Sequence, residues 1–191
     1  VLVLDRPNPL GGEKIEGPIL DIDHQSFVGY YPIPIRYGMT IGELAKMIVG
    51  EKWIRAIPEL DVIEMSGWDR SMYFDDTGLT WVKPSPNIPD IETAIIYSGM
   101  CLVEGTNISE GRGTDHPFKY IGAPWMAEEV CMDLQGMKKL IGVEFIKQKF
   151  RPRSIKGVVN SPKYDGKSCI GFKVRVKDRA QYNSVLVGVQ A

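Results

Sequence analysis

Residues 1–9 read VLVLDRPNP, and this stretch decides the fold class. Four apolar residues in a row are typical of a central strand of a parallel sheet, which is buried on both faces. The prolines then end the strand. Because open α/β sheets bind ligands beyond the carboxyl ends of their strands, Asp5 and Asn8 are candidate ligand contacts. The alternative is a simple turn, in which Asp5 pairs with Arg6 or caps the backbone.

The chain then alternates between helical and extended patterns. Thr40 and Glu43 form a capping box, which predicts a helix that ends near Gly50. Later helices are expected in an almost wholly apolar run and after Pro124, where Met126, Val130, Leu134 and Met137 recur at helical spacing. The expected elements are a helix at 40–50, a strand at 60–65, a buried helix at 90–102 and a helix from 124 to about 139.

The end of the chain is rich in strand patterns. A strand begins near residue 143, and residues 170–177 alternate between apolar and mostly basic side chains, as a half-buried strand does. The sequence therefore predicts an α/β protein with a parallel sheet in residues 1–145 and the beginning of a smaller, strand-rich domain in residues 146–191. Because the chain starts and stops on apolar runs, we read it as a slice of a longer protein.

Composition excludes several classes of protein. The net charge of −1 argues against nucleic-acid binding. The sequence contains no run of 18 apolar residues, which is about the length that a membrane-spanning helix needs. Cys101, Cys131 and Cys169 are widely spaced, show no metal-type pairing and cannot all be paired internally, and the first two are expected to be buried thiols. His24 and His116 have no second ligand at metal spacing, so no metal or other cofactor is expected.

The richest polar segment is EGTNISEGRGT, residues 104–114. Its three glycines allow close approach of the backbone to a ligand. Glu110 is the best candidate for a general acid or base, with Arg112 to tune its pKa and Asn107 to bind a hydroxyl group. The alternative is a capped surface loop that a Glu–Arg pair holds in place.

Two further segments hold candidate ligand contacts. Arg36 precedes a helix N-terminus and could bind a carboxylate, although a structural salt bridge explains it as well. Ser85 and Asn87 lie in the proline-stiffened segment WVKPSPNIP, residues 81–89. Trp68, Trp81 and Trp125 could each cover the apolar face of a sugar, or could simply belong to the core.

Phosphate-binding and serine-nucleophile motifs are missing. There is no Walker sequence, no Gly-x-Gly-x-x-Gly after a strand and no Gly-x-Ser-x-Gly. Residues 147–179 hold 11 Lys or Arg residues and two acids. This basic segment is either a solvated sheet face or a surface that attracts an anionic polymer.

In order along the chain, five motifs resemble one family. They are LDRPNP at 4–9, PIRYGMTIGELA at 34–45, WVKPSPNIP at 81–89, EGTN with SEGRGT at 104–114, and GAPW at 122–125. The chain resembles the bacterial exo-β-N-acetylmuramidases, long known as a domain of unknown function, over essentially all 191 residues. The resemblance implies a Rossmann-like domain, of which residues 1–145 are the second half, followed by a smaller C-terminal domain.

The resemblance also implies an activity. These glycosidases remove terminal N-acetylmuramic acid from peptidoglycan fragments in a cleft between the two domains. The implied partner is a peptidoglycan-derived saccharide, and export to the periplasm or cell surface is expected. A Glu-His-Gly stretch that is thought to hold a catalytic glutamate has no match here, so the principal carboxylate is expected upstream, and this chain alone is expected to be inactive. Glu110 would then be the second carboxylate of a pair.

Two other functions compete with this prediction. One is a non-catalytic module that binds peptidoglycan or another sugar. The other is a nucleotide-using Rossmann enzyme, which the missing phosphate loop disfavours. Under the leading interpretation, the loops at residues 5–9, 85–89 and 107–114 should converge on one cleft.

Overall fold

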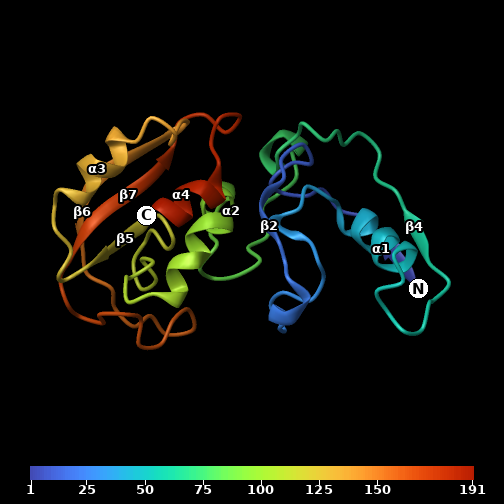
Figure 1. Ribbon diagram of the computed structural model, residues 1–191, viewed down its shortest axis with the longest axis horizontal. Helices are drawn as coiled ribbons and strands as arrows, with labels where there is room; N and C mark the ends of the chain where they lie inside the picture. The colour runs from blue at the N-terminus through green and yellow to red at the C-terminus, as the bar shows by residue number, and fades with distance from the viewer. The chain divides into compact units, whose positions relative to one another are not determined.

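The computed structural model describes residues 1–191, except for the side chain of Cys131, and is a mixed α/β structure. The chain divides into two compact units, Val1–Trp81 and Val82–Ala191 (Figure 1). The domain boundary that we predicted at residues 145–146 falls inside the second unit, within a continuous strand, β6 (Val143–Phe150).

The first unit contains a pair of parallel strands. β1 (Leu2–Leu4) lies beside β4 (Asp61–Ile63) in parallel, and the helix α1 (Ile41–Gly50) packs on both (Figure 1). The predicted strand and its parallel direction are therefore confirmed. The predicted burial is wrong: Leu2 is 62% exposed and Leu4 61%. The reason is that, among the described residues, β1 pairs with β4 alone and α1 packs on this two-stranded sheet.

An antiparallel ribbon forms the rest of the regular structure in this unit. β2 (Glu16–Ile19) pairs with β3 (Pro34–Arg36), and short 3₁₀ turns lie at Ile22–His24 and Phe74–Thr77. No large apolar side chain among residues 1–81, all of which the structure describes, is fully buried. The buried positions of this unit are Gly11, Glu16, Arg36, Gly38, Thr40 and Gly42.

Polar capping fixes the start of α1. The Thr40 hydroxyl accepts a hydrogen bond from the Glu43 N–H at 3.2 Å, and the Glu43 carboxylate accepts one from the Thr40 N–H at 2.9 Å. This is the predicted capping box, and the helix ends at Gly50, as expected.

The second unit is built on an antiparallel sheet with the strand order β5–β7–β6. β5 (Tyr120–Ala123) and β6 (Val143–Phe150) flank β7 (Cys169–Val176), and the helix α3 (Val130–Gly136) packs on β6 and β7. Phe172 and Val174 on β7 are fully buried, which confirms the alternation predicted for residues 170–177.

Two helices complete the core of this unit. α2 (Ile91–Met100), capped by Asp90, continues into a 3₁₀ turn at Cys101–Gly105 and packs against α4 (Ser184–Gln190) (Figure 1). The two backbones touch where glycines meet: a Cβ on Gly99 would lie 1.8 Å from the Ser184 carbonyl oxygen. The buried helix predicted at residues 90–102 is thus confirmed, with Ile95 and Ile96 at its centre.

Two predictions of secondary structure need correction. The helix expected from Pro124 begins at Val130, because residues 124–129 form turns in which the Met126 N–H donates to the Ala123 carbonyl. The apolar end of the chain, which we assigned to a strand-rich domain, folds as α4. The Asn183 side chain caps α4 by accepting from the Leu186 N–H at 2.8 Å.

The cysteines are free thiols where the structure describes their side chains. Cys169 is buried, as Phe172 and Val174 on the same strand are, whereas Cys101 is only half-buried. Burial raises the pKa of both thiols. The prediction for Cys131 lies outside the described side chains. Within the described chain, no helix has both the length and the apolar character needed to cross a membrane.

Candidate functional site

The predicted site residues lie in both units. Asp5, Asn8 and Arg36 belong to the first unit, and Ser85, Asn87, Asn107, Glu110 and Arg112 belong to the second. The predicted convergence of all three loops on one cleft therefore stays a prediction.

A hollow lies at the carboxyl end of the two parallel strands in the first unit. It has a volume of about 180 Å³ and is lined by residues 5–7, which follow β1, and by residues 65–68, which follow β4. Thr77 and Leu79 complete its wall. This is the edge at which open α/β sheets bind their ligands.

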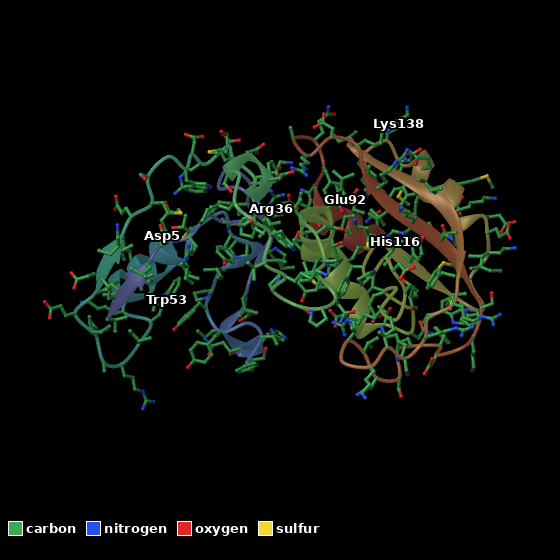
Figure 2. The ribbon with its side chains drawn as sticks, turned by 180° about the vertical axis from the view of Figure 1, so that it is seen from behind. Asp5, Arg36, Trp53, Glu92, His116 and Lys138 are labelled. Atoms are coloured by element: carbon green, nitrogen blue, oxygen red, sulfur yellow. The ribbon has the colours of Figure 1, made fainter. Side chains whose placement is uncertain are left out.

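Asp5 is committed to the start of α1. Its Oδ1 accepts from the Gly42 N–H at 2.7 Å and its Oδ2 from the Thr40 hydroxyl at 2.8 Å (Asp5 is labelled in Figure 2). The carboxylate thus occupies the position at a helix N-terminus where an anion is most stable. A Cβ on Gly42 would lie 2.8 Å from the Asp5 Cγ, so the contact depends on glycine. This is the capping alternative for Asp5, and its contact with substrate stays a prediction.

Asn8 and Arg36 also hold the backbone together. The Asn8 amide donates to the Met39 carbonyl at 2.8 Å and its oxygen accepts from the Leu10 N–H at 2.9 Å. Arg36 is 3% exposed and forms an ion pair with Glu16 across the β2–β3 ribbon at 2.6 Å (Figure 2). A second guanidinium nitrogen of Arg36 donates to the Leu10 carbonyl. The geometry matches the structural salt bridge that we kept as the alternative.

Two residues that line the hollow have side-chain donors without an acceptor among the described residues. The Arg6 side chain is exposed and enters no hydrogen bond or ion pair, although its backbone N–H donates to Asp5. The Nε1 atom of Trp68 is buried and also lacks an acceptor. Sequence reasoning named neither as a ligand contact beyond the general suggestion of a sugar platform for Trp68. The position of Arg6, directly after the first strand, was the signal that could have identified it.

Glu110 in the second unit is buried beside two cations. Its side chain is 5% exposed, with Oε2 at 3.1 Å from the Lys163 Nζ and Oε1 at 3.9 Å from the Arg112 Nε. Lys163 also donates to the carbonyls of Val103, Glu104 and Ile108, each at 3.0 Å. We predicted that the 107–114 loop lines a cleft; for the Glu110 side chain this is wrong in the described chain, because it is buried beside Lys163.

Arg112 is held from two sides. It forms an ion pair with Glu104 at 2.8 Å, and its guanidinium carbon lies 5.1 Å from the centre of the Phe118 ring. The 104–114 loop therefore has the Glu–Arg pair of the structural alternative, with Glu104 as the nearer partner.

The remaining predicted residues are Ser85, Asn87 and Asn107, and the last two form hydrogen bonds with residues 158 and 164. Ser85 accepts from the Asn87 N–H at 3.3 Å, and the Asn87 amide donates to the Val158 carbonyl at 3.5 Å. The exposed Asn107 accepts a hydrogen bond at its carbonyl from the Tyr164 hydroxyl, which in turn accepts from the Trp125 indole at 3.0 Å. Trp125 is 58% exposed, so its ring remains available to a sugar.

The described residues contain no group of three or more His, Cys, Asp or Glu side chains that could hold a metal ion. His116, labelled in Figure 2, packs against Tyr120, with 4.7 Å between the centres of the two rings. Burial lowers its pKa, and Lys173 and Lys119 lower it further.

Comparison with known proteins decides the family. The N-terminal profile of the exo-β-N-acetylmuramidase NamZ matches residues 1–92, and the C-terminal profile matches residues 95–191. The chain belongs to the NamZ family. The two profiles meet between residues 92 and 95, close to the junction of the two compact units at Trp81 and Val82.

Relatives of the NamZ family resemble this chain along nearly its whole length. The peptidoglycan β-N-acetylmuramidase NamZ of Bacillus subtilis (strain 168) is 46% identical over 188 residues, which is 98% of this chain and 43% of the relative. A crystal structure of a DUF1343 family protein from Bacteroides fragilis has a TM-score of 0.88 and 33% identity, and covers 97% of this chain and 47% of that one.

A second DUF1343 structure from Bacteroides fragilis gives a TM-score of 0.72 and 38% identity, with 90% of this chain and 43% of that chain covered. The chain thus spans less than half the length of these NamZ family relatives.

Proposed function

We propose that this chain is part of an enzyme that releases terminal N-acetylmuramic acid from peptidoglycan fragments. The observation that carries the proposal is the 46% identity to the Bacillus subtilis peptidoglycan β-N-acetylmuramidase over 98% of the chain. Because the chain spans 43% of that relative, the activity belongs to the longer polypeptide, and a peptidoglycan-derived saccharide is its partner.

We also propose that the first unit is the second half of a Rossmann-like domain. Two observations support this: β1 and β4 run parallel, and their carboxyl ends border a hollow. Val1, Leu2, Leu4 and Ile63 are each more than half exposed, as expected for strands whose neighbours lie elsewhere in a larger sheet. On this proposal, additional strands and helices would cover these side chains.

The test of the activity is release of N-acetylmuramic acid from a disaccharide by the natural polypeptide that carries this chain. A substrate with N-acetylmuramic acid at its non-reducing end should yield the free sugar. The matched control has N-acetylglucosamine at that end and should stay intact. Hydrolysis of both substrates, or of neither, would contradict the proposal.

A non-catalytic sugar-binding module is the second candidate. Glu110, the carboxylate that the sequence singles out for acid or base chemistry, is buried and ion-paired to Lys163. Glycosidases normally need two carboxylates that reach the scissile bond. Binding of the disaccharide without release of N-acetylmuramic acid would favour this second candidate.

Location follows from the substrate. Peptidoglycan lies outside the cytoplasmic membrane, so we propose that the polypeptide acts in the periplasm or at the cell surface. Fractionation of the source bacterium with an antibody to this chain checks the proposal, which recovery in the cytoplasmic fraction alone would overturn.

A further inference from the structure

The hollow at the carboxyl end of β1 and β4 has a defined size and an unusual set of polar groups. Its volume of about 180 Å³ equals that of roughly six water molecules at about 30 Å³ each. It can therefore hold a polar substituent of a few carbon and oxygen atoms, but not a whole disaccharide. Gly67, with nothing within 4 Å of where a Cβ would stand, keeps one side open.

Two of the acceptors that line this hollow, on Asp5 and Thr77, are already engaged. Asp5 receives hydrogen bonds from the Gly42 N–H, the Thr40 hydroxyl and the Arg6 N–H. The Thr77 hydroxyl donates to the Phe74 carbonyl at 2.6 Å. Asp5 and Thr77 therefore have little hydrogen-bonding capacity left for a ligand, because they already bond to groups of the protein.

The donor that a ligand can reach is Arg6. Its guanidinium has five N–H groups, is exposed and has no acceptor among the described residues. The Trp68 Nε1 also lacks an acceptor, but protein atoms enclose it. A free guanidinium matches a carboxylate, which only accepts hydrogen bonds and binds arginine through two oxygens.

We propose that this hollow binds the carboxylate of the ligand, with Arg6 as the ion-pair partner. The inference rests on the proposed function and extends it. N-acetylmuramic acid differs from N-acetylglucosamine by a lactyl ether that carries a carboxylate. Arg6 therefore determines specificity between the two sugars.

Kinetics on matched substrates test this assignment. The natural polypeptide and its Arg6→Gln variant are compared on the N-acetylmuramic acid disaccharide and on the same disaccharide with the lactyl carboxylate converted to an amide. The variant should lose about 30-fold or more in kcat/KM on the acid, mostly through KM, and should change little on the amide. Equal losses on both substrates, or no loss on the acid, would overturn the proposal.

Matched variants exclude unfolding and general charge effects. Arg55 is an exposed arginine of the same unit with no partner among the described residues, so Arg55→Gln should leave the preference for the acid unchanged. A loss of preference in Arg55→Gln equal to that in Arg6→Gln would contradict the assignment.

A binding measurement separates this proposal from the proposed activity. If the natural polypeptide releases no sugar, the activity fails, and calorimetry with free N-acetylmuramic acid and N-acetylglucosamine still tests the hollow. Binding of the acid alone, abolished by Arg6→Gln, supports the carboxylate site. Binding of both sugars alike, or of neither, overturns it.

Discussion

At the scale of single residues, the ion pair between Glu110 and Lys163 organises the loop at residues 104–114. Lys163 contacts the Glu110 carboxylate and three carbonyls of residues 103–108, so one ammonium group satisfies both a buried charge and the end of the turn that follows α2. A buried carboxylate without such a partner would be costly.

We therefore predict that Glu110→Gln lowers the free energy of unfolding by about 1–3 kcal/mol, because it leaves the Lys163 charge uncompensated. Lys163→Met should cost at least as much, since it also removes the bonds to the carbonyls. Denaturant titration of both single variants and the double variant gives the coupling energy. An unchanged midpoint, together with a rate loss of about 100-fold or more, would instead support the catalytic role first predicted for Glu110.

His116 provides a prediction about pH. Burial lowers its pKa, with Lys173 and Lys119 adding to the effect and Asp115 and Asp90 opposing it. The unfolded state therefore binds a proton at a higher pH than the folded state, and stability falls as the pH drops below about 6.5. Because the ring is only partly buried, His116→Gln should remove only on the order of 0.5 kcal/mol of this loss. Thermal midpoints at pH 5 and pH 8 measure it, and an equal pH dependence in the variant would refute it.

At the scale of elements, the close crossing of α2 and α4 depends on glycine. A Cβ on Gly99 would stand 1.8 Å from the Ser184 carbonyl oxygen, and one on Gly188 would stand 2.2 Å from the Gly99 carbonyl oxygen. Neither obstacle is a flexible side chain, so the helices would have to separate.

Gly99→Ala should therefore destabilise the protein by about 2 kcal/mol or more, because it overpacks a rigid contact. Gly136→Ala is the matched control. Gly136 also lies in a helix, α3, but a Cβ there meets nothing within 4 Å, so this variant should be neutral or slightly stabilising. Thermal unfolding of the two variants decides the matter, and a similar loss in both would argue against the packing explanation.

Elements with a local signal were predictable from sequence. The capping box of Thr40 and Glu43 and the alternation along β7 are contained within a few residues, and both are confirmed. The start of α3 and the fold of α4 were not predictable, because they depend on tertiary packing. α4 packs closely on α2 at Gly99 and Gly188, a contact that no local pattern reveals. The burial of Glu110 depends on Lys163, 53 residues later, which no local pattern reveals.

At the scale of the whole molecule, the two units differ in how they are stabilised. The second has a conventional apolar core around Phe172, Ile96 and Val187. Within residues 1–81, the buried groups include an ion pair and a helix cap, and many large apolar side chains are exposed. The exposed apolar side chains of the first unit support the proposal that it is part of a larger domain, and the chain covers 43–47% of its relatives.

The basic segment at residues 147–179 also acts at this scale. It carries 11 Lys or Arg residues against two acids, but part of this charge is neutralised within the fold. Lys149 pairs with Glu128 at 3.0 Å, and Arg175 pairs with Glu144 across β6 and β7. The charge left over is exposed and spread out, which favours weak, non-specific attraction to an anionic glycan over a defined site.

We predict that binding of the natural polypeptide to purified cell wall weakens as salt rises. Between about 0.01 M and 0.15 M ionic strength the screening length falls from about 30 Å to about 8 Å, so attraction between spread surface charges largely disappears. Lys156→Gln combined with Lys167→Gln, which removes two exposed charges, should reduce the salt dependence without changing affinity for the uncharged polymer chitin. Sedimentation with insoluble wall measures both effects. Binding that is the same at low and physiological salt would show that the basic segment is only a solvated face, because charge attraction in water cannot escape screening.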